Sequence, residues 1–439
     1  MMRRVVLKAR SSFLNGFLLR WSKSRTVNAG FVRRFNRRLD GPESPGGGIR
    51  MTMPNLSSGL FVILLLPLGK VVPANAKELF EETCVFVGGQ DNINTYRIPS
   101  LACTRRGTIL AFCEGRKDSN GDGTPTHLVM KRSLGNAGTW NPPHQSGPVP
   151  EGRSRERNMT WLPMQIILPC KRKEAYMNPV PIIDQSDEAI YLLVNYHALY
   201  DPKRDEFGGD THIWLLKSRD EGATWSKPTD LTPQVGAREL GPGAGIQTSR
   251  GTLVAPVYDG VIYSEDHGKT WQGGSKTPGP VNESQVVELA DGSLMLNTRG
   301  APVRTVIISK DGGRSWGEPH PVPSLSDPEL YGGCQASLIR YPNLNIKGSQ
   351  NLLLFANPAD LKYRMNLTVR VSFDEGMTWP VSKLIRKGSG AYSCLTIFPD
   401  GTIGIIYETG NTYSGIIESY AMLAFARFNL EWLTGGRNQ

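Results

Sequence analysis

One stretch of this chain decides its fold: SRDEGATW, residues 218–225. Its pattern, Ser-x-Asp-x-Gly-x-Thr/Ser-Trp, returns at residues 264–271, 309–316 and 372–379, and a degenerate copy stands at 133–140. The Asp can accept a bond from the backbone two residues on, the Gly supplies a positive φ, and the Thr or Ser hydroxyl closes the turn. The Trp brings a large apolar surface to bury beside the turn. Such repetition indicates an array of similar hairpin units.

Short β-rich segments separated by Gly, Asp, Asn and Pro fill the rest of the chain, and amphipathic helices are nearly absent. The clearest segments are 108–112, 189–195, 213–217, 252–257, 305–309, 352–356 and 402–407. Many short strands favour a sandwich, a barrel or a propeller, and one aromatic motif per hairpin unit selects the propeller. We therefore predict an all-β, six-bladed β-propeller with four antiparallel strands per blade. Residues 419–428 are expected to close the ring against a strand near residues 84–87.

Positive charge is concentrated at the amino-terminal end. Residues 1–50 contain 12 Lys or Arg against two acidic residues, whereas the remainder balances 38 basic with 38 acidic residues. The basic net charge of the chain is therefore a property of this leader, and it gives no support to nucleic-acid binding by the folded part.

The leader has two parts. From Met51 or Met53 a polar start, an apolar run at 60–68 and the small residues at 74–76 match a secretory signal. The run is short for a bilayer span, although a membrane anchor stays open as an alternative, and we expect no transmembrane span in the mature chain. The Arg-rich stretch before it fits a mitochondrial transit peptide or a translated untranslated region. We predict that residues 1–76 lie outside the fold and that residues 77–435 form the propeller domain.

Metal and cofactor signals are weak. The six cysteines show no metal-like spacing, so we interpret them as small buried hydrophobic residues, with one disulfide as an open alternative. Residues 118–123 resemble the start of a calcium loop, but Val129 stands where the bidentate Glu belongs. The histidines form no ligand pair. We expect neither a metal nor a cofactor.

Three arginines stand in apolar strand contexts: Arg97, Arg299 and Arg364. A guanidinium group in such a place is costly unless an anion pairs with it. If the three converge, they form a fixed cationic site for a carboxylate or phosphate. Taken singly, such an arginine is more often a snorkelling surface residue or a member of a structural ion pair.

At this point several segments together resemble a known family. The repeats, YRIP at 96–99, EGRK at 114–117 and MNPVP at 177–181 are similar to exo-α-sialidases of bacteria and animals, and the similarity extends over residues 83–428 in the family's order. The resemblance implies a six-bladed propeller whose Asp-box repeats lie away from the active site and have no catalytic role.

The resemblance also implies a catalytic set. The family's nucleophile falls on Tyr392, its partnering glutamate on Glu283 and its general acid/base on Asp122. A neutral phenol suits this substrate, because the anomeric carbon of sialic acid already bears a carboxylate that would repel a second anion. A free Tyr has a pKa of about 10, so the phenol needs a base and nearby positive charge to attack. Sialidases are an exception to the usual carboxylate nucleophile of retaining glycosidases.

Substrate-binding positions follow from the same resemblance. They are the arginine triad for the substrate carboxylate, the acid that orients its first arginine, a further arginine, and two residues near the N-acyl pocket: Arg97, Arg299, Arg364, Glu408, Arg116, Met177 and Asn178. Glu283 lies inside the sequon at 282–284, where a glycan would crowd the site, so we predict that Asn282 carries none.

These residues predict a retaining exo-α-sialidase acting on glycoproteins, glycolipids such as gangliosides, or oligosaccharides. The alternatives are a sialoside-binding propeller without turnover, a trans-sialidase, and an Asp-box receptor or scaffold. The signal-like segment and the sequons at Asn158, Asn282 and Asn366 favour the secretory pathway, with a lysosomal or extracellular location. The oligomeric state stays open.

Overall fold

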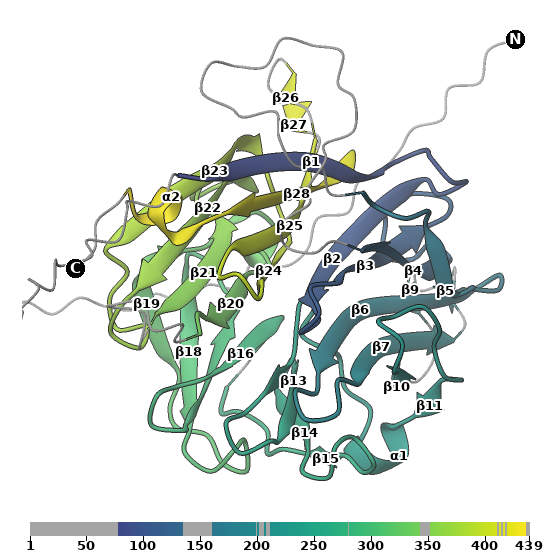
Figure 1. Ribbon diagram of the computed structural model, residues 1–439, viewed down its shortest axis with the longest axis horizontal. Coiled ribbons are helices and arrows are strands. Elements are labelled where there is room, and N and C mark those ends of the chain that lie inside the picture. Colours follow the sequence, from purple (N-terminus) through teal and green to yellow (C-terminus); the bar gives the residue numbers. More distant parts are fainter. Residues whose placement is uncertain are drawn as a thin grey trace, which may run out of the picture. The chain divides into compact units, whose positions relative to one another are not determined.

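The computed structural model describes residues 78–134, 160–198, 200–201, 206–207, 211–279, 281–342, 352–410, 412–413, 416–417 and 419–435. Nearly all of the ordered elements in these ranges are antiparallel β-strands, and their sheets follow one another to form a β-propeller (Figure 1). The predicted leader, residues 1–76, lies outside the described residues. No helix in the described part of the chain is long and apolar enough to span a membrane.

The strands form four sheets of four strands, one sheet of eight and two small hairpins. The four-stranded sheets are, in pairing order, β12 (Ile246–Gln247), β13 (Leu253–Val257), β14 (Gly260–Ser264) and β15 (Gln272–Gly273); β16 (Ser284–Glu288), β17 (Leu294–Thr298), β18 (Val303–Ser309) and β19 (His320–Ser326); β20 (Ser337–Arg340), β21 (Leu353–Pro358), β22 (Met365–Ser372) and β23 (Val381–Ser389); and β24 (Ser393–Ile397), β25 (Ile403–Thr409), β28 (Met422–Phe428) and β1 (Phe80–Val87).

The eight-stranded sheet contains β2 (Thr95–Cys103), β3 (Ile109–Arg116), β4 (Thr126–Ser133), β5 (Gln165–Leu168), β6 (Glu174–Ile183), β7 (Ile190–Ala198), β10 (Thr211–Ser218) and β11 (Thr229–Asp230). The remaining elements are short: β8 (Tyr200–Asp201), β9 (Glu206–Phe207), β26 (Thr412–Tyr413), β27 (Ile416–Ile417), α1 (Thr232–Val235), α2 (Leu430–Thr434) and the 3-10 turn η1 (Leu330–Gly332).

The propeller class is confirmed, but the expected six separate four-stranded sheets are not found. Four sheets have four strands, and the strands from β2 to β11 form one larger sheet. A single parallel residue pair, Thr126 with Ala175, joins β4 to β6 within it. Sequence patterns carry no information on such a contact, because it depends on how two neighbouring sheets approach each other.

The strand predictions are confirmed. Each β-rich segment singled out in the sequence falls on a strand: β3, β7, β10, β13, β18, β21 and β25. The predicted closure is also present, since β28 pairs antiparallel with β1 and places Cys84 opposite Ala424. The first and last described strands therefore belong to one sheet (Figure 1).

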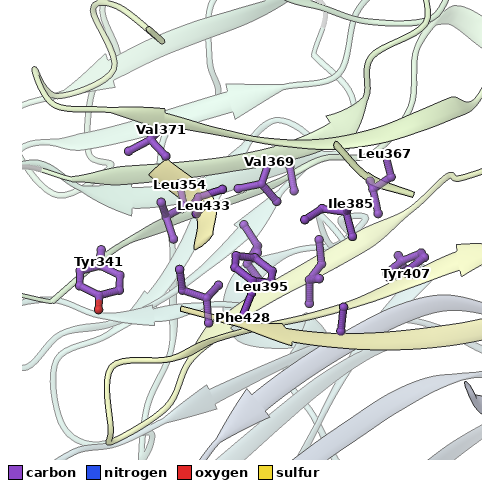
Figure 2. Close-up of a cluster of buried hydrophobic side chains, with 14 of the residues drawn as sticks. Tyr341, Leu354, Leu367, Val369, Val371, Ile385, Leu395, Tyr407, Phe428 and Leu433 are labelled. Carbon is purple, nitrogen blue, oxygen red and sulfur yellow. The ribbon is translucent and has the colours of Figure 1, made fainter. Parts of the chain in front are cut away.

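Apolar clusters fill the spaces between neighbouring sheets. In one of them Leu354 and Val369, from β21 and β22, lie against Leu395 and Phe428, from β24 and β28 (Figure 2). A cavity of about 320 Å³ is lined by residues of β2, β6, β12, β16, β20 and β24 or their immediate neighbours. All six cysteines are free, so the disulfide alternative is wrong for this structure.

The four intact repeats share one hydrogen-bonded turn. In the first copy Asp220 Oδ1 accepts bonds from Ser218 Oγ (2.8 Å) and the Thr224 N–H (2.9 Å), and its Oδ2 accepts from the Thr224 hydroxyl (2.6 Å). The carboxylate therefore bonds the backbone four residues on, not two as predicted, because Glu221 and Gly222 both have positive φ and tighten the turn. The same bonds recur in the other three copies.

All four intact repeats begin at the last residue of a strand: β10, β14, β18 and β22. The degenerate copy begins at Ser133, the last residue of β4, and its residues 135–140 lie outside the described residues. The Trp residues of the intact copies pack against the clusters between the sheets, and Trp271 is buried. The repeats thus cap strand ends and seal the core there.

Candidate active site

Polar and charged residues gather at the strand ends opposite the repeats. Arg97 lies near the start of β2, Glu283 directly precedes β16, and Tyr392 directly precedes β24. Neighbouring strands run antiparallel, so the first and third strands of a sheet point the same way. The start of a first strand therefore lies opposite the end of a third strand, where the repeats stand. This separation agrees with a structural role for the repeats.

Arg97 is held by a buried carboxylate. Its Nε donates to Glu408 Oε1 at 2.9 Å and its Nη2 donates to Oε2 at 3.5 Å. The register of β2 with β3 shifts after Arg97, where Ile98 has a φ of 55° and donates its N–H to the same Glu408 oxygen at 2.9 Å. Glu408 is completely buried in β25. The two strands thereby fix the direction of the guanidinium group.

Tyr392 stands at the centre of the site. Its hydroxyl donates to Glu283 Oε1 at 2.5 Å and accepts from Arg299 Nη1 at 3.0 Å. The same Arg299 nitrogen donates to Glu283 Oε2 at 2.7 Å, so each of the three side chains is hydrogen-bonded to the other two. Burial, and after it the charge of Glu283, raises the pKa of Tyr392 well above its usual value, although Arg299 and Arg364 oppose the shift. The resting side chain is therefore a neutral phenol.

Three guanidinium groups surround this phenol. Arg299 is hydrogen-bonded to it, and the Cζ atoms of Arg97 and Arg364 lie 5.4 and 5.2 Å from the centre of its ring. Arg364 directly precedes β22, and its Nη2 donates to the Gly333 carbonyl at 3.1 Å. The three arginines come from separate sheets and converge at one point. Such an arrangement suits a bound carboxylate.

Asp122 lies at the rim, in the connection between β3 and β4. Its side chain is 74% exposed, and its Oδ1 lies 2.7 Å from Arg116 Nη1 and 3.9 Å from Arg97 Nη1. Arg116 is buried and donates from Nε and Nη2 to Glu114 Oε2, at 2.9 and 2.6 Å. Arg116 also donates to the Asn120 carbonyl, so the stretch at 118–123 that resembles the start of a calcium loop is organised around an arginine.

Comparisons with known proteins identify the family of this chain. A family profile described as a BNR repeat-like domain matches residues 149–405. A sialidase from Micromonospora viridifaciens is 32% identical over 401 residues, which cover 84% of this chain and 56% of that protein. A sialidase from Bacteroides fragilis is 30% identical over 357 residues, which cover 73% of this chain and 61% of that protein. The chain belongs to the sialidase family.

A solved structure agrees with this assignment. The Hadza microbial sialidase Hz136 is 29% identical and superposes with a TM-score of 0.66, covering 80% of this chain and 69% of that protein. This sialidase chain spans less than two thirds of the two bacterial relatives, 56% and 61% of their lengths.

The two residues expected near an N-acyl pocket differ in their surroundings. The β6–β7 register shifts after Met177, and Asn178 has a φ of 54°. Asn178 is buried and donates its backbone N–H to Glu114 Oε1 at 3.0 Å, so it touches the partner of Arg116. Met177 keeps its register opposite Asn195. The structure therefore brings Asn178 into the site through its backbone.

Sequence reasoning missed three residues of this sialidase site. Glu114 is completely buried beside Arg116, and burial raises its pKa against the opposing charge of that arginine. The Tyr420 ring lies 3.9 Å from Arg97 Cζ, and its hydroxyl accepts from Arg364 Nη1 at 3.1 Å. Burial and then the charge of Glu283 raise the pKa of Tyr258, which places that phenol close to the site. Tyr258 could have been found from its place in the sequence, because it directly follows β13, at the strand end opposite the repeats.

Proposed function

We propose that this protein is an exo-α-sialidase that hydrolyses terminal α-linked sialic acid from glycoproteins, glycolipids or oligosaccharides, with retention of configuration. One observation carries the proposal: the Tyr392 phenol is hydrogen-bonded to Glu283 at 2.5 Å while three arginines surround it. A base-activated phenol beside a cationic anion site suits an anomeric carbon that bears its own carboxylate.

Tyr392 acts as the nucleophile in this proposal. Its oxygen attacks the anomeric carbon while its proton passes to Glu283 Oε1, the oxygen that it already contacts. The raised pKa of Tyr392 makes this base necessary, because few phenolate molecules exist at neutral pH. Arg299 Nη1 contacts both the phenol oxygen and Glu283, so it stabilises negative charge on either group as the proton moves.

Asp122 completes the reaction as general acid and then general base. It protonates the leaving oxygen when the glycosidic bond breaks, and it later takes a proton from the water that cleaves the tyrosyl-linked intermediate. Its exposed position at the rim supports this role, since the leaving group departs toward solvent. The contact with Arg116 must give way to the substrate before the proton moves.

The arginines bind the substrate carboxylate. Arg97, Arg299 and Arg364 are directed by fixed acceptors, among them Glu408 and the Gly333 carbonyl, so little reorganisation is needed on binding. The transition state gains positive charge at the anomeric carbon next to this carboxylate. A firmly held carboxylate therefore keeps the reacting carbon above the phenol.

We also propose that the ring has six blades, with the eight-stranded sheet counted as two. Two observations support this. Among the described residues, a single strand-paired position, Thr126 with Ala175, joins its two halves, and the axial cavity is lined from six strand positions: β2, β6, β12, β16, β20 and β24. We propose further that residues 77–435 are the catalytic domain and that the preceding signal-like segment directs the protein to the secretory pathway or lysosome.

The test is turnover of a fluorogenic sialoside by the wild type and Tyr392→Phe. The variant keeps the ring and loses the nucleophilic oxygen, so kcat should fall by about a thousandfold or more. In the wild type, 2,3-difluorosialic acid should leave a covalent adduct on the peptide that contains Tyr392, detected by mass spectrometry.

Tyr341→Phe is the matched control. It also removes a buried hydroxyl, one that donates to the Gly401 carbonyl at 2.7 Å away from the charged groups, and it should retain wild-type turnover. Equal activity of the wild type and Tyr392→Phe would end the tyrosyl mechanism. Sialoside binding without turnover by the wild type would instead favour a binding protein, and sialyl transfer to an added sugar would favour a trans-sialidase.

A further inference from the structure

One short segment binds two of the three arginines. It runs from Asp327 to Cys334 between β19 and β20. Arg299 Nη2 donates to the Tyr331 carbonyl, and Arg364 Nη2 donates to the Gly333 carbonyl. Among the residues that the structure describes, the buried Nε atoms of Arg299 and Arg364 have no hydrogen-bond partner. The two carbonyls therefore contribute much of what orients these guanidinium groups.

The segment has an unusual backbone. Tyr331, Gly332 and Gly333 have φ values of 61°, 64° and 103°, and Tyr331 is not a glycine. Residues with side chains rarely adopt such angles, and a run of them persists only where the surroundings determine it. The structure must therefore contain groups that hold this segment in place.

Those groups include two backbone hydrogen bonds, from the Glu329 and Leu330 N–H groups to the Leu361 and Lys362 carbonyls, and a completely buried ion pair. Asp327 and Arg304 are both 0% exposed, and their charged atoms lie 2.9 Å apart. Asp327 Oδ1 accepts from the Cys334 N–H at 3.0 Å, and Oδ2 accepts from the Gly300 N–H at 3.2 Å. Arg304 Nη1 donates to the Cys334 carbonyl at 2.7 Å. The pair thus binds the end of the segment and also the residue that follows Arg299.

Stability alone does not account for this pair. Desolvating two charges costs about as much as their attraction returns, and apolar replacements of buried ion pairs are often at least as stable. The structure shows no hydrogen bond from the pair to Tyr392, Glu283 or Asp122. Its hydrogen bonds lead instead to Cys334 in the arginine-binding segment and to Asn297 and Gly300 on either side of Arg299.

We propose that Asp327, held by Arg304, positions the substrate-binding arginines of this protein. It fixes the Tyr331 and Gly333 carbonyls, and these set the directions in which Arg299 and Arg364 present their remaining N–H groups. Asp327 and Arg304 are positioning residues, because they lie beneath the site and touch no reacting atom. This inference rests on the proposed function in one respect, that the two arginines receive the substrate carboxylate.

Two neighbouring glycines provide the test. A Cβ on Gly333 would lie 2.7 Å from Asp327 Oδ2 and 2.9 Å from Arg299 Cγ, whereas a Cβ on Gly332 would meet nothing within 4 Å. Both glycines have positive φ, so both alanine variants carry backbone strain. Only Gly333→Ala should displace the aspartate and the arginine.

The expected result is a difference in binding. Displacing a guanidinium group by a fraction of an ångström should raise KM for a fluorogenic sialoside by about tenfold or more, because misplacements near 1 Å can cost about a hundredfold. The dissociation constant of an unsaturated sialic acid, measured by calorimetry, should rise in parallel. Since the carboxylate is bound both before and during reaction, kcat should fall less than KM rises. Gly332→Ala, whose added Cβ meets no atom within 4 Å, should raise KM less than Gly333→Ala does.

A second pair covers the case in which Gly333→Ala does not fold. Arg304→Lys keeps the charge beside Asp327 but lacks the Nε that donates to Asn297 Oδ1, and it should weaken inhibitor binding by several-fold. Arg340→Lys, which changes the half-buried ion pair with Glu375, is the control, and it should not weaken inhibitor binding. Melting temperatures separate folding from positioning.

The outcomes are distinguishable. Equal inhibitor affinity of Gly333→Ala and Gly332→Ala, or of Arg304→Lys and Arg340→Lys when both fold, would overturn the positioning role. A wild type that binds the inhibitor without turnover would overturn the proposed hydrolysis, and the affinity comparison would still decide the role of Asp327.

Discussion

At the scale of single residues, the chemistry of Tyr392 comes from its neighbours. It is one of 14 tyrosines in the chain, and no local sequence feature makes its phenol acidic or basic. Glu283, Arg299 and Glu408 contact its hydroxyl or backbone from three different strand ends. The arginines lower the cost of negative charge there, whereas burial and Glu283 raise it, and the net effect favours the neutral phenol.

This balance predicts the response of stability to alkali. The folded pKa of Tyr392 lies above its unfolded value of about 10, so the protonated phenol contributes stability that is complete below pH 10 and is lost as pH rises toward the folded pKa. Tyr392→Phe removes this titration. The free energy of unfolding of the wild type minus that of the variant should fall by up to about 1.4 kcal/mol per pH unit above pH 10.

Denaturant unfolding between about pH 8 and pH 11 measures this difference. The other buried tyrosines titrate in both proteins and cancel in the comparison. A difference that stays constant over the range would show that Tyr392 ionises in the folded protein as it does in the unfolded chain.

At the scale of elements, the two ends of the strands have different roles: one end carries the repeat turns and the other carries the site residues. Each intact repeat closes a turn at the last residue of a third strand, and the bonds of its Asp carboxylate are made inside its own eight residues. The site residues stand at the opposite ends and bond to distant elements, as Arg97 does to Glu408. Local bonds can therefore be replaced without moving the site, whereas a change in a site residue affects several elements.

Asp266→Ala should destabilise the protein without changing its chemistry. The carboxylate accepts bonds from Ser264, Thr270 and the Lys269 N–H, and their loss should lower the melting temperature by a few degrees, about 1–4 °C. Turnover per folded molecule should be unchanged. Lys269→Ala in the same turn is the control, because it keeps the backbone donor, and it should melt within about a degree of the wild type.

The same variant should show a pH dependence of known sign. Burial by itself raises the pKa of Asp266, but the hydrogen bonds from Thr270, Ser264 and Lys269 outweigh it and lower the pKa to about 2. The stability from this carboxylate is present above about pH 4 and is lost as pH falls toward 2. The gap in melting temperature between the wild type and Asp266→Ala should therefore narrow below pH 4. A difference in melting temperature that increases as the pH falls would contradict a stabilising role of the ionised Asp266 carboxylate.

At the scale of the whole molecule, one sheet joins the two ends of the described chain. β1 pairs with β28 from Phe80 opposite Phe428 to Val87 opposite Met422. The Phe80 ring stacks on Trp432 of α2 at 4.4 Å, and Lys131 Nζ donates to the Val85 carbonyl at 2.9 Å. β1 is thus held by strand pairing on one side and by separate contacts with α2 and β4.

Two truncations test this closure together with the domain boundary. Removing residues 1–76 should leave folding and turnover intact, since the predicted domain starts at residue 77. Removing residues 1–88 should expose the edge of β28 and an apolar cluster, so we expect loss of the cooperative thermal transition and aggregation. Circular dichroism melts and size-exclusion chromatography measure both. A cooperative, active protein lacking β1 would show that the ring does not need its closing strand.

Much of the fold could be predicted because its signals are local. The repeat turns bond within eight residues, and the β-rich segments around 252–257 and 402–407 became strands at nearly those bounds. Three arginines also stood out locally, since apolar neighbours make an unpaired guanidinium costly. The roles of Tyr392, Glu283 and Asp122 came from family resemblance, not from any property of their surroundings in the sequence.

The sequence by itself determined the strands, the capped turns and the propeller class, because each depends on residues that are close together in the chain. Only the tertiary structure decided which distant groups meet: Asn178 with Glu114, Tyr420 with Arg97, and Glu283 with Tyr392. These contacts depend on where strand ends and bulges place side chains after the sheets have packed around one axis. Ångström-scale placement of that kind leaves no periodic trace along the chain.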